Sequence, residues 1–193
     1  MQPIGIRRRD ASRPAAAEPH ALPHGVVLRR LVAHRDDRGR VAEFFRNEWS
    51  PGFAPAQWSF TVTEAGVMRG VHLHLRHDDY FVLLEGRLTL GLRDLRAGSP
   101  TADCTALLEL RDEDPLAVFI PHGVAHGFLS LARSIYVLGT SHCYDLTDEL
   151  GCHWRDPDLG IGWPTDTARL SPRDAALPRM RELAARVPPW RAG

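Results

Sequence analysis

The feature that most constrains the fold is a succession of short apolar runs separated by turn-forming residues, beginning near Val27. The stretch "YFVLLEGRLTLGLRDLR" predicts two strands joined by a turn at Glu85-Gly86, and its second half alternates between apolar and polar residues. The runs "LAVFIPHG", "GFLSLA" and "SIYVLGT" continue the pattern. Short strands with turns between them favour a β-sandwich or barrel over alternating strands and helices.

The two ends of the chain differ from this pattern. Residues 1–24 are rich in Pro, Ala and Arg and contain no apolar signal-peptide region, so we expect a flexible N-terminal arm. Residues 25–193 are expected to form a single domain. Its last part, "SPRDAALPRMRELAARV", has a helical rhythm and predicts two short helices divided at Pro178. No apolar run approaches the roughly 20 residues that a membrane-spanning helix needs.

The charged residues exclude several functional classes. Acidic and basic residues balance at 24 each, so no net field attracts nucleic acid or an anionic membrane. Every basic residue is arginine, which removes lysine-based Schiff-base chemistry, including the usual attachment of pyridoxal phosphate. The sequence has no glycine-rich phosphate loop, and its three cysteines form no CxxC pair, which favours a reduced, cytoplasmic protein.

One stretch, "GVMRGVHLHLRHDD" (residues 66–79), has the spacing of a metal site. With "PHGVAH" further along, it resembles the two motifs of the metal-binding cupins, in which a glutamate stands where Asp79 does. Residues two apart on a strand share a face, so His72 and His74 would point the same way. With Asp79 and His126 they would complete a metal-ligand set, although Asp is shorter than Glu. A purely structural role for these histidines is the alternative.

Motifs outside that stretch indicate a different chemistry. "HRDDRGRVAEFFR", "GVMRGVHLH", "IPHGVAHGFLSL", "HWRDPDLGIGWP" and "LSPRDAALP" follow one another in this order. Together, from about Val27 to about Pro178, they closely resemble the dTDP-4-dehydrorhamnose 3,5-epimerase family, a branch of the cupin superfamily. The resemblance implies a cupin-type jelly roll, a homodimer, and epimerisation at C3, C5 or both of a nucleotide-linked, dTDP-type 4-keto-6-deoxy sugar without a cofactor.

Such a reaction needs a base beside the ketone, a proton donor on the opposite face, and positive charge or donors for the enolate. The resemblance implies that His72 is the base, that Asp174 orients it, and that Tyr136 is the proton donor. It also implies a set of residues that hold the sugar and nucleotide: Arg38, Glu43, Gln57, Arg69, His126, Tyr144, Glu149 and Arg173. Arginine suits a diphosphate because its planar fork binds two oxygens at once.

Several of these residues also have ordinary structural interpretations. Tyr136 lies in an apolar strand and is typical of a core residue with a satisfied hydroxyl group. Asp174 follows Pro172 and is in a position to cap a short helix. Arg38 lies in an Asp-Arg-Gly sequence that is typical of a turn.

The resemblance departs from the family pattern at the residues that complete the metal motif. Asp79 stands where the family carries a lysine, and its charge would repel an enolate; Arg76 is the nearby candidate to replace that lysine. His74 stands where glutamine is typical. A metal on His72 would occupy the lone pair that a base needs. The metal-dependent cupin with His72, His74, Asp79 and His126 as ligands therefore remains an alternative, as does a non-catalytic cupin that binds a sugar nucleotide.

Overall fold

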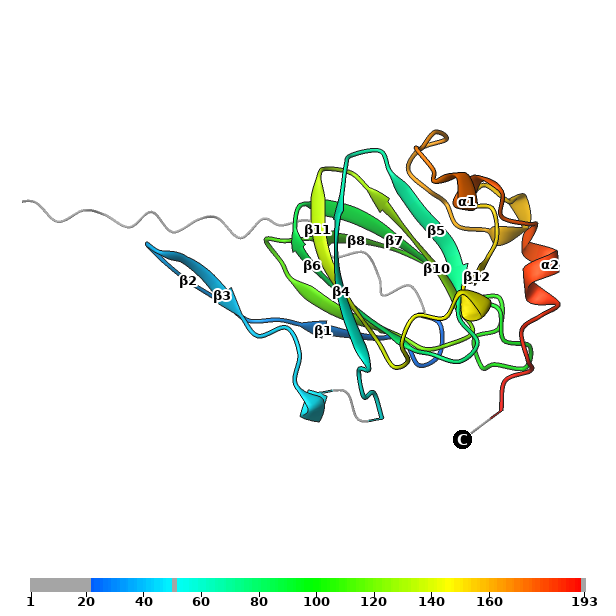
Figure 1. Ribbon diagram of the computed structural model, residues 1–193, viewed down its shortest axis with the longest axis horizontal. Coiled ribbons are helices and arrows are strands. Elements are labelled where there is room, and N and C mark those ends of the chain that lie inside the picture. The colour runs from blue at the N-terminus through cyan, green and yellow to red at the C-terminus, as the bar shows by residue number, and fades with distance from the viewer. Residues whose placement is uncertain (1–21, 50–51, 192–193) are drawn as a thin grey trace, which may run out of the picture.

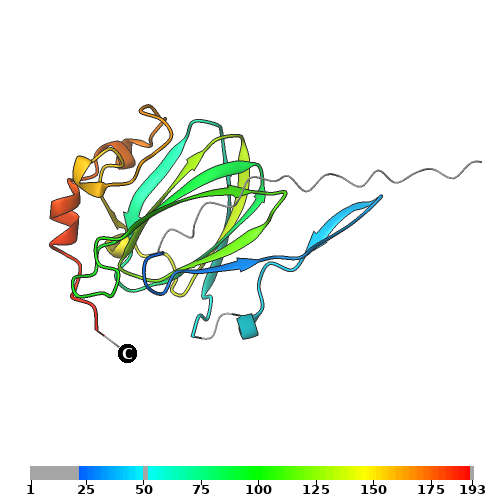
Figure 2. The ribbon, with the colours of Figure 1, turned by 180° about the vertical axis from the view of Figure 1, so that it is seen from behind.

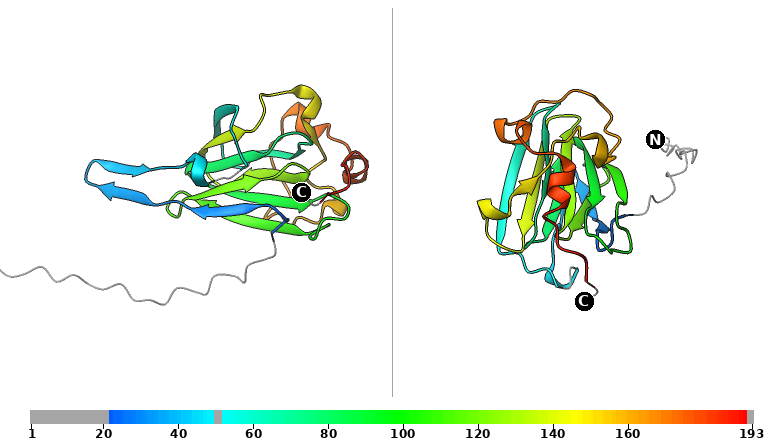
Figure 3. Two further views of the ribbon diagram at one scale, coloured as in Figure 1. Left: turned by 90° about the horizontal axis from the view of Figure 1, so that it is seen from below. Right: turned by 90° about the vertical axis from the view of Figure 1, so that its right-hand side faces the viewer.

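Two antiparallel sheets face each other in the computed structural model of the protein, which describes residues 22–49 and 52–191 (Figure 1). The first sheet has the order β1 (Val27–Arg30), β9 (Leu116–Ile120), β6 (Asp79–Glu85), β11 (Ser134–Thr140) and β4 (Gln57–Thr63). The second has the order β12 (Leu150–Gly151), β5 (Met68–Leu73), β10 (Val124–Ser130), β7 (Arg87–Asp94) and β8 (Thr105–Arg111). The end-on view in Figure 3 shows these two layers, and the all-β jelly-roll prediction is confirmed.

The alternation in β6 shows why the sheets stack. Phe81 and Leu83 point into the space between the sheets, whereas Tyr80 and Val82 pack on the outer face of the first sheet. Across the interior, the ring of Phe81 stacks on Phe128 of β10 with centroids 4.4 Å apart. Because successive strand residues face opposite sides, one short run contributes to two apolar clusters.

The C-terminal segment covers the outer face of the second sheet. It contains η3 (Pro157–Leu159), α1 (Pro172–Ala175) and α2 (Met180–Ala184), so the predicted division near Pro178 is present. Trp154, Leu159 and Leu183 are buried there against Met68 and other residues of β5 and β10. Trp163 Nε1 donates a hydrogen bond to the Trp154 carbonyl at 3.1 Å, so these tryptophans have the packing role that the sequence suggested.

A hairpin of β2 (Ala33–Asp36) and β3 (Gly39–Ala42) projects from the end of the sandwich opposite the helices (Figures 1 and 2). Two short helical turns, η1 (Asn47–Trp49) and η2 (Leu146–Asp148), lie in the connections. Most of the predicted N-terminal arm, residues 1–21, lies outside the described residues.

The last residues of that predicted arm are packed onto the domain. Pro23 is buried, and the Arg96 guanidinium donates to the His24 carbonyl at 2.6 Å. The boundary expected at residue 24 therefore falls too late. None of the described helices combines the length and apolar character that a membrane crossing requires, and the cytoplasmic location stays a prediction.

Candidate active site

A cavity of about 370 Å³ opens between the two sheets, and most of the predicted site residues line it. Its walls come from β4 and β11 on one side and from β5 and β10 on the other, with α1 at the rim. The predicted residues that line it are His72, Asp174, Tyr136, Gln57, Arg69, His126, Tyr144, Glu149, Arg173, His74 and Asp79. Residues up to 117 positions apart in the sequence are thus brought to one site.

Gly70 shapes the strand that carries the histidine. Its φ of 114° lies in the region that favours glycine, and a Cβ there would come within 2.9 Å of Gly127 Cα and the His126 carbonyl. The pairing of β5 with β10 shifts register at this place. The irregularity allows Arg69 and His72, three residues apart, to line the same cavity, which strict strand alternation would prevent.

His72 forms a partly buried pair with Asp174 of α1, with 2.8 Å between His72 Nε2 and Asp174 Oδ1. A carboxylate only accepts, so Nε2 carries the hydrogen and the lone pair of the neutral ring lies on Nδ1. Burial opposes ionisation of Asp174, but its hydrogen bonds from His72 and Ser171 outweigh this and lower its pKa. The helix cap is Ser171, whose hydroxyl accepts from the Asp174 amide at 3.0 Å. The capping role considered for Asp174 therefore belongs to Ser171.

Tyr136 lies on the opposite sheet from His72, in β11. Its side chain is buried among the interior aromatic rings and also lines the cavity, so the core interpretation and the site interpretation both apply. Burial raises the pKa of Tyr136, with nearby Arg69 acting in the other direction. The phenol is thus held protonated at neutral pH, as a proton donor must be.

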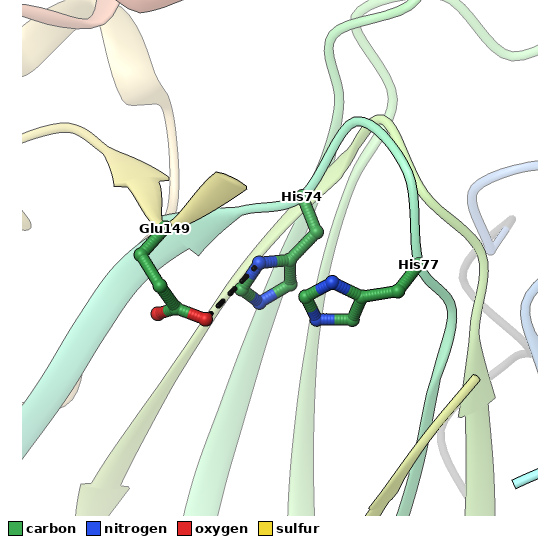
Figure 4. A group of neighbouring side chains, drawn as sticks. All are labelled: His74, His77 and Glu149. Atoms are coloured by element: carbon green, nitrogen blue, oxygen red, sulfur yellow. Dashed lines mark ion pairs between the residues drawn. The ribbon is translucent and has the colours of Figure 1, made fainter. Parts of the chain in front are cut away.

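A second group of histidines lies beside this pair. His74, His77 and His126 surround the carboxylate of Asp79. Glu149 approaches His74 from the side away from His77 (Figure 4). Two three-residue sets have ligand atoms close enough to share a metal ion: His74, Asp79 and His126, and His74, His77 and Glu149. His72 belongs to neither set, so the structure differs from the four-ligand alternative at that residue.

Three predicted residues lie elsewhere. Arg38 bonds to Asp36 in the projecting hairpin, and Glu43 pairs with Arg46; neither lines the cavity. Arg76, the candidate replacement for the family lysine, is exposed and pairs with Asp145 at 2.5 Å instead of entering the cavity. On the rim, Arg173 donates to the Glu149 carbonyl at 3.0 Å.

Sequence reasoning also missed residues in the cavity. His77 is present in the stretch "HLHLRHDD", two positions before Asp79, and the richness of that stretch in histidine was the available signal. Ser59 and Thr61 line the wall formed by β4, where alternation with Trp58 and Phe60 indicates a polar inner face. Asp148 receives hydrogen bonds from the Leu75 and Arg76 amides at 2.9 and 3.1 Å and fixes the turn that carries His77.

A jelly roll with a partly buried histidine–aspartate pair opening into a polar cavity defines a cupin-type enzyme equipped for proton transfer. A sequence model of the dTDP-4-dehydrorhamnose 3,5-epimerase family matches residues 21–182, and the chain belongs to that family. It is an isomerase, an epimerase acting at C3 or C5 of dTDP-4-keto-6-deoxy sugars, which confirms the predicted family and reaction class.

Three relatives illustrate the similarity. The chain is 33% identical to the spore coat polysaccharide biosynthesis protein SpsL of Bacillus subtilis, covering 74% of this chain and 97% of that protein. It is 32% identical to a dTDP-4-dehydrorhamnose 3,5-epimerase of Streptomyces griseus, covering 84% and 86%. The crystal structure of ChmJ, a 3'-monoepimerase from Streptomyces bikiniensis in complex with dTDP-quinovose, superposes with a TM-score of 0.80 at 32% identity, covering 88% and 92%.

Proposed function

We propose that this protein inverts both C3 and C5, or only one of them, in a dTDP-linked 4-keto-6-deoxy sugar. In this reaction His72 is the base and Tyr136 is the proton donor. The observation that carries the assignment is the His72–Asp174 pair at 2.8 Å, which opens into a cavity that Tyr136 also lines. Asp174 holds the hydrogen on Nε2, so Nδ1 is the nitrogen that accepts the sugar's proton.

The two sheets supply the two faces that inversion requires. His72 comes from β5 in the second sheet and Tyr136 from β11 in the first. A sugar ring between them has the base on one side and the phenol on the other. A sugar carbon that loses a proton to His72 therefore receives another proton from Tyr136 on its opposite face. The configuration of that carbon inverts.

Binding of the nucleotide is assigned to the rim. Arg69 and Arg173 are exposed cations that line the cavity, and arginine forks suit the two phosphates. Gln57 and Tyr144 lie together there, because the Gln57 side chain accepts from the Tyr144 amide at 2.9 Å. The exposed Tyr144 ring offers an apolar surface for a base.

Arg38 and Glu43 fit this function if the protein is a homodimer. Within one chain they lie at the projecting hairpin, away from the cavity. The outer face of the edge strand β4 exposes Trp58, Phe60 and Val62, with Phe60 74% exposed. A second copy that covers this apolar strip would bury it and would bring its hairpin toward a neighbouring cavity. Light scattering of wild type and of Phe60→Glu tests this: a dimer that the substitution dissociates is expected, and a monomeric wild type contradicts the assembly.

Product analysis tests the reaction. The protein is incubated with dTDP-4-keto-6-deoxyglucose, the keto group is reduced with borohydride, and the sugars are identified by NMR. Inversion at both carbons identifies a 3,5-epimerase, and inversion at one identifies a mono-epimerase. An unchanged sugar contradicts the proposal for this substrate.

A further inference from the structure

Three histidine rings converge on one carboxylate at the end of the cavity. Asp79 begins β6, His74 and His77 lie in the turn just before it, and His126 comes from β10. Asp79 Oδ2 lies 3.1 Å from His126 Nε2 and 3.6 Å from His74 Nε2, and Asp79 Oδ1 lies 3.6 Å from His77 Nε2. All four side chains are buried. The rings of His74 and His77 stack with centroids 3.9 Å apart (Figure 4).

The other nitrogen of each ring already faces an acceptor. His74 Nδ1 lies 3.2 Å from the Asp148 carbonyl, and His126 Nδ1 lies 3.2 Å from the Val124 carbonyl. His77 Nδ1 lies 3.0 Å from the Asp148 carboxylate. These oxygens only accept, so each Nδ1 carries a hydrogen. In a neutral ring, Nε2 then has no hydrogen, and its lone pair faces Asp79.

The hydrogen bonds of this cluster leave electron pairs without a hydrogen. Each neutral ring has its hydrogen on Nδ1, directed at an acceptor other than Asp79, so no neutral ring donates to the Asp79 carboxylate. Asp79 Oδ1 is buried without a hydrogen-bond partner, which is costly for a charged group. The cluster therefore presents several electron pairs and too few hydrogens.

We propose that His74 Nε2, His126 Nε2 and the Asp79 carboxylate bind a divalent first-row transition-metal ion. For metal–ligand bonds of about 2.1 Å, neighbouring ligand atoms lie roughly 3.0 Å apart in an octahedron and 3.4 Å in a tetrahedron. The separations of 3.1 and 3.6 Å between Asp79 and the two histidine nitrogens are close to those edges. Two imidazoles and a carboxylate suit zinc, iron or cobalt better than magnesium or calcium, which prefer oxygen ligands alone.

The groups behind the ligands have the pattern that metal-binding histidines require. Each ring donates its remaining N–H to a carbonyl or a carboxylate, which fixes its tautomer and orientation. Asp148 serves two of the three rings and also holds the turn through the Leu75 and Arg76 amides. The ligands are therefore prearranged.

This site leaves the proposed base free. His72 Nε2 is engaged by Asp174, and His72 belongs to neither metal-capable set. The metal hypothesis and the proton-transfer hypothesis, which exclude each other at His72, are thus compatible once the ion is held by the neighbouring residues. A catalytic role for the ion rests on the proposed function: a dication here would place positive charge in the cavity where enolate charge develops. The chain has no lysine to supply that charge.

Direct metal binding tests the site without substrate. The full-length protein is stripped with a chelator and titrated with Co²⁺, which is followed by its visible absorption, and then with Zn²⁺ in competition. One equivalent of Co²⁺ with the spectrum of a nitrogen- and oxygen-liganded ion is expected. Asp79→Asn should weaken binding by on the order of 100-fold. Asp78→Asn is the matched control, since Asp78 instead pairs with His122 at 2.7 Å, and its affinity should be unchanged.

Two further variants separate the possible failures. If Asp79→Asn does not fold, as judged by circular dichroism, His74→Gln replaces it with the same expected loss. His72→Asn should bind Co²⁺ as wild type does; loss of binding there would overturn the proposed ligand set. Wild type that binds no stoichiometric cation, or equal affinities in the Asp78 and Asp79 variants, would overturn the site. Stoichiometric binding by a protein that does not epimerise the sugar would remove the proposed function and leave the site.

Discussion

Asp174→Asn is the substitution that most specifically tests how His72 works. Asp174 is 5% exposed and accepts from His72 Nε2 at 2.8 Å, so it stabilises the imidazolium that forms when His72 takes a proton. A hydrogen bond between charged partners contributes about 1.5 to 3 kcal/mol. Because each 1.36 kcal/mol is tenfold in rate, loss of the charge should slow proton abstraction about 10- to 150-fold. If the amide of the substituted side chain donates to His72 Nε2, the hydrogen of the ring moves to Nδ1. That nitrogen can then not accept the sugar's proton, and the rate falls further.

The assay is the rate at which the substrate's C3 and C5 protons exchange for deuterium, followed by NMR. Asp156→Asn is the control, since Asp156 is likewise a buried carboxylate but caps η3 and lies outside the cavity. It should lower the melting temperature while leaving exchange unchanged. A folded Asp174→Asn variant that exchanges within about twofold of wild type would refute the role given to the pair.

Other consequences of the structure are measurable in the same protein. Tyr136→Phe should slow inversion more than exchange, because the first proton loss does not need the phenol; equal slowing in NMR would contradict the donor assignment. Asp94, buried beside Arg96, has its pKa lowered: burial opposes ionisation, but hydrogen bonds from Arg96 and its neighbours prevail. The contribution of ionised Asp94 to the free energy of unfolding is therefore complete above the ordinary carboxyl pKa. It is lost as the pH falls through the lowered pKa of Asp94 in the folded protein. Asp94→Asn should cost on the order of 3 kcal/mol in urea unfolding at pH 7, with a smaller difference below about pH 4; a pH-independent difference would contradict this. Burial raises the pKa of Cys152 to about 12, so a thiol reagent should label the exposed Cys143 first; comparable labelling rates would argue against that burial.

The sequence predicted the fold because the alternation is strong where it matters. In β6 and β7 apolar residues face two clusters, and the turn at Glu85-Gly86 lies between them, as expected. The family followed from motifs spread along the chain. Residue roles came from that resemblance, since nothing local indicates that His72 and Asp174, 102 positions apart, are in contact.

What the sequence could not predict depends on local backbone geometry and on competing contacts. Alternation places His72 and His74 on one strand face and so suggests four metal ligands. It cannot show that Asp174 engages Nε2 of His72, which leaves His74 to join Asp79 and His126. The position of Arg38 could not be predicted either. Its sequence motif does not indicate that the β2–β3 hairpin projects away from the cavity of the same chain.

A comparison of wild type with His72→Asn shows whether His72 removes the sugar's proton. Wild type and His72→Asn are each incubated in heavy water with dTDP-4-keto-6-deoxyglucose, and the C3 and C5 proton signals are followed by NMR. We expect loss of one or both signals with wild type and their persistence with the variant, while binding of dTDP is nearly unchanged. Exchange at the wild-type rate in His72→Asn would show that another group is the base.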